Sequence, residues 1–130
     1  MTRPSVLVAD DDARFLAALR IRFEAAGFDV VTTEDAYQAL EQSRRFDPDI
    51  LILDINMPAG NGFSVKRRME QIPALAQIPI IYITGQDQDS VEKSAEELGA
   101  YAILYKPLYI DELIAITRNA LADRQNMILT

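Results

Sequence analysis

The chain contains no cysteine and no histidine. Without cysteine it can form no disulfide, no thiolate metal site and no cysteine nucleophile. Without histidine it lacks the base of a Ser–His triad, the common zinc ligand and a phosphohistidine of its own. Its chemistry must therefore rest on carboxylates, hydroxyls, amides and amines.

Basic residues and long apolar runs are also scarce. The chain has 13 Lys and Arg against 20 Asp and Glu, a formal net charge of −7. The usual electrostatic attraction to nucleic acid or anionic lipid is therefore missing. No apolar stretch reaches the ~20 residues of a membrane span, and no secretory signal follows the first residues. We expect a cytoplasmic domain that binds neither nucleic acid nor membrane directly.

The 130 residues, 49% hydrophobic and 25% charged, are typical of one folded domain. Short apolar runs, typical of buried strands, alternate with segments of helical period. The runs span 6–9, 28–31, 50–53, 78–83 and 101–105, and the helical segments span 12–26, 35–45, 63–71, 90–98 and 110–122. This alternation predicts an α/β fold with a doubly wound, five-stranded parallel sheet and helices on both faces. We expect a single domain over 1–130, with a core at about 5–122 and a tail at 123–130.

Acids, a hydroxyl and an amine follow the predicted strands directly. These residues are Asp10, Asp11, Asp12, Asp54, Thr84, Gly85 and the pair Lys106-Pro107. Binding sites of doubly wound sheets gather at the carboxyl ends of the strands. A single aspartate there often marks only the point where a strand meets water. Acids from two strands, with a hydroxyl and a lysine from two others, indicate a functional site instead.

The chemistry of this set favours a metal ion and a phosphoryl group. Two carboxylates ~4 Å apart repel by several kcal/mol at an effective dielectric of ~20, so such a site must raise their pKa values or bind a cation. Oxygen ligands without histidine or cysteine favour Mg²⁺. Thr84 adds a hydroxyl donor and Lys106 a second positive charge, which suits transfer of a phosphoryl group to a carboxylate.

In these motifs the chain resembles the receiver domains of two-component response regulators. The matching stretches are 6–12 (VLVADDD), 53–62 (LDINMPAGNG), 83–85 (ITG), 99–100 (GA) and 106–107 (KP). Intervals of 43, 30 and 22 residues separate Asp11, Asp54, Thr84 and Lys106 in turn. The resemblance extends over about 5–122 and implies a flavodoxin-like sheet with the strand order 2-1-3-4-5.

The resemblance also implies roles for the acidic residues. Asp54 would accept a phosphoryl group from the phosphohistidine of a sensor histidine kinase or a phosphotransfer protein. Asp11, the Asp54 carboxylate and the backbone carbonyl of Asn56 would bind Mg²⁺ directly, whereas Asp10 would act mainly through a metal-bound water. Asp12 is either a further ligand or the N-cap of the first helix, and its residue type and position favour the cap.

Thr84 and Lys106 would bind the oxygens of the phosphoryl group, and Pro107 would follow a cis peptide bond, by the same resemblance. Phosphorylation would switch the face formed by three segments, 90–98, 101–105 and 110–122. This face would signal to a downstream output protein or an output domain, and it is also a candidate homodimer interface. Ile103 departs from the family, because many receivers carry a Tyr or Phe there. An aliphatic side chain cannot offer a tyrosine hydroxyl to a partner.

A receiver is a signalling module rather than an enzyme, although it would catalyse its own phosphotransfer and dephosphorylation. The main alternative is a degenerate receiver, which keeps the fold as a protein-interaction module and is never phosphorylated. A flavin or nucleotide binder would need a phosphate-cradling loop where Asp10, Asp11 and Asp12 would repel a phosphate. A magnesium-dependent phosphohydrolase would need its nucleophile after the first strand, and substrate-binding insertions that 130 residues hardly hold.

Overall fold

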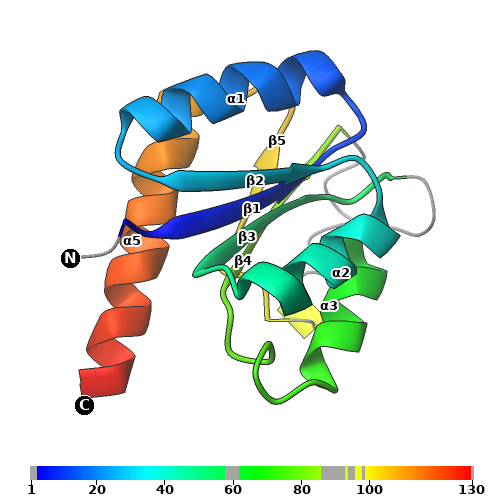
Figure 1. The fold of residues 1–130 in the computed structure, drawn as a ribbon, viewed down its shortest axis with the longest axis vertical. Coiled ribbons are helices and arrows are strands. Elements are labelled where there is room, and N and C mark those ends of the chain that lie inside the picture. Colours follow the sequence, from blue (N-terminus) through cyan, green and yellow to red (C-terminus); the bar gives the residue numbers. More distant parts are fainter. Residues whose placement is uncertain (1–2, 58–61, 86–92, 94–95, 98, 130) are drawn as a thin grey trace.

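Five parallel strands form one sheet in the computed structural model of the chain (Figure 1). The structure describes residues 3–57, 62–85, 93, 96–97 and 99–129. The strands are β1 (Ser5–Ala9), β2 (Asp29–Thr33), β3 (Ile50–Asp54), β4 (Ile80–Thr84) and β5 (Ala102–Tyr105). Their order across the sheet is β2-β1-β3-β4-β5. The predicted fold class and strand order are therefore confirmed.

Helices cover both faces of the sheet (Figure 1). They are α1 (Ala13–Ala25), α2 (Ala36–Phe46), α3 (Gly62–Glu70) and α5 (Ile110–Leu129). Because side chains alternate along a strand, Leu7 of β1 packs with residues of α2 and α3, whereas Val6 and Val8 pack with residues of α1 and α5. The central strands are thus buried on both faces, which explains why their sequences are continuously apolar.

The first helix begins where the aspartate run ends. The Asp12 side chain accepts hydrogen bonds from the backbone N–H groups of Arg14 and Phe15, at 3.0 and 3.2 Å. The helix ends before Gly27, whose φ of +101° is one that glycine adopts without strain. Asp12 is therefore the N-cap of α1, as its residue type predicts.

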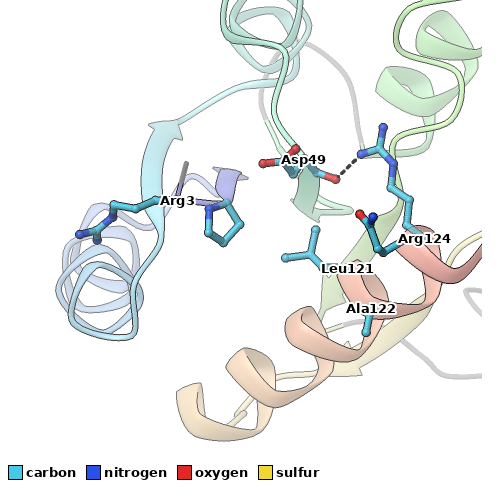
Figure 2. Close-up of a pocket in the computed structure, with 7 residues that line it drawn as sticks. Arg3, Asp49, Leu121, Ala122 and Arg124 are labelled. Carbon is cyan, nitrogen blue, oxygen red and sulfur yellow. Dashed lines mark hydrogen bonds between the residues drawn. The ribbon is translucent and has the colours of Figure 1, made fainter. Parts of the chain in front are cut away.

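The last helix is longer than the sequence pattern indicates. The prediction of a helix over 110–122 followed by a tail is wrong in extent, because α5 continues to Leu129. No proline or glycine interrupts this stretch, and two contacts anchor it to the domain. The Tyr101 hydroxyl donates to Asp123 at 2.6 Å, and the Arg124 guanidinium donates to the backbone carbonyl of Asp49 at 2.8 Å (Figure 2).

Two predicted strands are shifted along the chain. The fourth begins at Ile80 instead of residue 78, because Pro79 has no N–H to donate to a neighbouring strand. The second runs to Thr33 instead of residue 31, through two β-branched threonines that suit a strand. The helix predicted over 90–98 lies outside the described residues, except for 93, 96 and 97. Within the described part of the chain, no helix has the length and apolarity needed to cross a bilayer.

Candidate functional site

The parallel sheet brings the strand-end residues of β1, β3, β4 and β5 to one edge. Asp10 follows β1 and is fully buried, and Asp54 ends β3 with 5% of its surface exposed. Asp11 is exposed beside them. One carboxylate oxygen from each of these three residues lies within 4.8 Å of the other two. Three of the four acids that the sequence singled out therefore form one cluster, and the fourth, Asp12, caps α1 instead.

Lys106 provides the positive charge of this cluster. Its ammonium nitrogen lies 2.9 Å from Oδ2 of Asp10 and 3.4 Å from Oδ2 of Asp54. The backbone of Lys106 is held against the end of β4, because its N–H donates to the carbonyl of Thr84 at 2.8 Å. The Lys106–Pro107 peptide bond is cis, as the resemblance implies. The lysine from the fifth strand thus meets acids from the first and third.

Burial and charge shift the pKa values of two of these groups. Burial raises the pKa of the Asp54 carboxyl, and the charge of Asp10 adds to this rise. The Asn56 N–H and the Lys106 ammonium offset only part of it. Burial lowers the pKa of Lys106, but the hydrogen bond and charge of Asp10, with those of Asp54, outweigh burial, so that this pKa lies above its ordinary value. Like charges are crowded around Asp54, and an added cation would relieve that crowding.

Backbone groups orient both buried carboxylates. Oδ1 of Asp10 accepts a hydrogen bond from the Asp12 N–H at 2.9 Å, and Oδ1 of Asp54 accepts one from the Asn56 N–H at 3.0 Å. Oδ2 of each residue faces Lys106 instead. Both carboxylates are therefore held in one orientation by their own loops.

Thr84 ends β4 and is fully buried at this edge of the sheet. Its backbone carbonyl, which accepts from Lys106, links it to the lysine. Gly85 follows, and a Cβ atom at this position would meet no atom within 4 Å. The structure thus places the predicted hydroxyl residue next to open space at the carboxyl edge.

Two residues near the acids were not predicted as site residues. The Lys106 ammonium lies 5.3 Å from the centroid of the Phe15 ring. Gly62 begins α3, and a Cβ atom there would lie 2.9 Å from the backbone oxygen of Asp54. In the sequence, Phe15 shows only the helical spacing of a core residue, and Gly62 is one of two glycines in a predicted loop.

The donor set fits a magnesium ion. The groups gathered at the cluster are carboxylate oxygens, which are ligands that Mg²⁺ accepts together with water. The net negative charge of three carboxylates against one ammonium also favours a cation. The carboxylates of Asp10, Asp11 and Asp54 could hold such an ion, and Asp10 also contacts Lys106 and the Asp12 N–H.

A pocket of about 490 Å³ lies away from this cluster, beside the start of β1 and the second half of α5 (Figure 2). It is lined by Arg3, Pro4, Asp49, Leu121, Ala122, Arg124 and Gln125. Both arginines already donate to backbone carbonyls: Arg3 to Glu24 and Phe28, and Arg124 to Asp49. The pocket contains none of the predicted site residues.

The fold and this acidic edge define a receiver domain, and the comparisons with known proteins agree. Residues 6–118 match the response regulator receiver domain family, so the chain belongs to that family. Among solved structures, the receiver domain of a Francisella response regulator is 28% identical and superposes with a TM-score of 0.85, covering 92% of this chain and 98% of that one. A receiver domain protein from Methanospirillum hungatei is 19% identical and shares the fold, with a TM-score of 0.90 over 97% of this chain and 99% of that one.

Curated relatives include proteins of different length. The transcriptional regulatory protein PrrA of Mycobacterium tuberculosis is 33% identical over 124 residues, which are 95% of this chain and 52% of that protein. The DNA-binding transcriptional regulator NtrC of Rhizobium meliloti is 34% identical over 95% of this chain and 25% of its own length. The chain thus spans about half or less of these two relatives. By contrast, the match to the polar-differentiation response regulator DivK of Brucella ovis, 26% identical, covers 92% of this chain and 97% of that protein.

Proposed function

We propose that this chain is a phosphorylatable receiver in which Asp54 accepts a phosphoryl group from a phosphohistidine. The donor is a sensor histidine kinase or a phosphotransfer protein. The observation that carries the proposal is the placement of Lys106 between Asp10 and Asp54, with both carboxylates buried at the carboxyl edge of the sheet. A degenerate receiver would have no phosphoryl group for a lysine placed beside Asp54 to bind.

In the transfer step, one carboxylate oxygen of Asp54 forms a bond to phosphorus while the bond between phosphorus and the donor nitrogen breaks. The imidazole nitrogen keeps the electron pair of the broken bond. The Asn56 N–H orients the nucleophile from one oxygen, and Lys106 provides positive charge on the side of the other. In dephosphorylation, water attacks the phosphorus and the Asp54 carboxylate leaves, which releases inorganic phosphate.

Magnesium binding completes the proposed site. The Asp11 and Asp54 carboxylates and the backbone carbonyl of Asn56 would hold Mg²⁺ directly, and Asp10 would do so through a water. When bound, the ion neutralises charge on the phosphoryl oxygens. Lys106 and the Thr84 hydroxyl then bind the phosphoryl oxygens as donors. The chain promotes transfer to itself and its own hydrolysis, and is a signalling module rather than an enzyme acting on a separate substrate.

The signal is read at the face that includes β5 and α5, to which the family resemblance adds the segment 90–98, most of which lies outside the described residues. Ile103 of β5 is partly buried and packs against the core cluster that includes Tyr82, so the change there is repacking of an aliphatic side chain. The partner is a downstream output protein or an output domain, since relatives such as PrrA are about twice as long as this chain. The same surface is the candidate interface for a homodimer.

Intact mass spectrometry after incubation with acetyl phosphate tests the proposal. With Mg²⁺ we expect the protein to gain one phosphoryl group, and with EDTA in place of Mg²⁺ we expect no gain. A protein that stays unmodified in both conditions, while keeping its fold, would instead be a degenerate receiver.

A further inference from the structure

The Lys106 ammonium contacts two different kinds of group. The first is carboxylate, since Asp10 and Asp54 lie at 2.9 and 3.4 Å. The ring of Phe15 is the second kind of group, with its centroid 5.3 Å from the ammonium nitrogen. This separation lies within the range in which a cation is attracted to the face of an aromatic ring.

Phe15 is also tied to the acids through the backbone. Oδ1 of Asp10 accepts from the Asp12 N–H, and the Asp12 side chain accepts from the Phe15 N–H at 3.2 Å. The Phe15 ring contacts Lys106, and Lys106 pairs with Oδ2 of Asp10. These contacts form a closed ring of four residues, so the backbone at Phe15 is linked to the same carboxylate that the lysine contacts.

We propose that Phe15 is a positioning residue for Lys106, whose ring holds the ammonium group beside the acceptor carboxylate of Asp54. The proposal rests on the proposed function of Asp54. The lysine side chain is 33% exposed, so water reaches it and its four-carbon stem has other rotamers available. Attraction to the Phe15 ring favours the rotamer in which the ammonium also lies beside Asp54. The benefit is therefore a faster phosphorylation of Asp54.

The substitution Phe15→Leu distinguishes the proposed positioning of Lys106 from ordinary apolar packing. Phe15 is partly buried and packs against the core cluster of α1 and α5. Leucine would retain apolar packing at this position, but it has no aromatic face for a cation. Tyrosine keeps the face. We therefore expect Phe15→Leu to take up phosphate from acetyl phosphate and Mg²⁺ roughly two- to fivefold more slowly than the parent, and Phe15→Tyr to match it.

The chain offers a matched control pair at a distance from the site. The guanidinium carbon of Arg45 lies 5.4 Å from the centroid of the Phe46 ring at the end of α2. Phe46→Leu removes a cation–aromatic contact of nearly the same separation, and we expect the rate of phosphorylation to stay unchanged. If Phe15→Leu does not fold, Phe15→Met serves as the second non-aromatic variant.

NMR of the unphosphorylated protein provides a readout that does not depend on phosphorylation. The ε-methylene protons of Lys106, assigned by their loss in Lys106→Arg, should be shifted upfield by the Phe15 ring and move downfield in Phe15→Leu but not in Phe15→Tyr. An unchanged lysine shift in Phe15→Leu overturns the proposal, as does phosphorylation of Phe15→Leu at the parent rate. If the parent protein itself gains no phosphoryl group, the proposed function fails. The downstream effect on phosphorylation then fails with it, and the lysine shift still decides whether Phe15 positions Lys106.

Discussion

The Lys106 ammonium lies 2.9 Å from Oδ2 of Asp10, although 96 residues separate the two along the chain. This ion pair joins the carboxyl ends of β1 and β5, which are not neighbours in the sheet. The lysine is closer to Asp10 than to Asp54, and Asp10 is fully buried. Before phosphorylation, the main partner of the lysine is therefore the buried acid of the first strand.

Removing the lysine should destabilise the protein. Lys106→Met leaves the buried Asp10 carboxylate without its ammonium partner, and we expect the free energy of unfolding at neutral pH to fall by roughly 1–3 kcal/mol. Urea unfolding in EDTA measures this change. Arg44→Met is the control, because it breaks an exposed ion pair with Glu41, and its effect should stay within about 0.5 kcal/mol. Equal effects of the two substitutions would show that the buried pair does not stabilise the fold.

The acceptor carboxylate should itself reduce the stability of the metal-free protein. Burial raises the pKa of Asp54 above 3.8, so its contribution to stability is fully present below that pH and is lost as the pH rises through the raised pKa. We therefore expect Asp54→Asn to have a higher free energy of unfolding than the parent at neutral pH in EDTA. The difference should shrink as the pH falls through the raised pKa of Asp54 and should be smallest below 3.8.

Chemical unfolding of the parent and Asp54→Asn across this pH range checks the sign. Glu41→Gln, which changes an exposed carboxylate on α2, should show a smaller difference at every pH. If the free energy of unfolding of Asp54→Asn at neutral pH is lower than that of the parent, this explanation is wrong.

Asp11 and Asp12 provide a comparison for metal binding. Both side chains are exposed, but Asp11 belongs to the cluster of three carboxylates and Asp12 caps α1. We expect Asp11→Asn to weaken Mg²⁺ binding roughly tenfold or more. Asp12→Asn should bind almost as tightly as the parent, since asparagine is also a good N-cap.

Titration of the melting temperature with Mg²⁺ measures both affinities, because a ligand of the folded state raises it. The parent and Asp12→Asn should respond at similar concentrations. The assignment of Asp11 as a ligand is wrong if Asp11→Asn responds like the parent.

Much of the fold could be predicted because local and global signals agree. The continuous apolar runs of β1, β3 and β4 indicate strands that are buried on both faces of the sheet. Asp12, followed by apolar residues at helical spacing, indicates the N-cap of a helix. The acids of the site could be predicted because each directly follows a strand. The order of the strands came from the family resemblance, since periodicity does not report which strands are neighbours.

The remaining features depend on contacts between distant parts of the chain. The extension of α5 rests on Tyr101 and on the backbone carbonyl of Asp49, which lie outside the helix. The contact between Phe15 and Lys106 depends on where α1 lies relative to the end of β5. In the sequence, the same phenylalanine shows only the spacing of a core residue.

Gly62 is a similar case, and its replacement should destabilise the protein. A Cβ atom at Gly62 would lie 2.9 Å from the backbone oxygen of Asp54 and 3.3 Å from the Tyr82 ring. We expect Gly62→Ala to lower the free energy of unfolding by roughly 1–3 kcal/mol. Gly85→Ala, where an added Cβ meets no atom within 4 Å, should be close to the parent. Thermal unfolding of both variants tests this prediction. Equal stabilities of Gly62→Ala and Gly85→Ala would show that the backbone around Gly62 accommodates a Cβ atom without strain.

The most direct test of the account is intact mass spectrometry of Asp54→Asn after incubation with acetyl phosphate and Mg²⁺, beside the parent and Asp29→Asn. Asparagine has the shape of aspartate but is a far poorer nucleophile. Asp29 is an exposed carboxylate at the opposite end of the sheet, where β2 begins. We expect one added phosphoryl group on the parent and on Asp29→Asn, and none on Asp54→Asn. A folded Asp54→Asn protein that gains the group as fully as the parent would contradict this expectation.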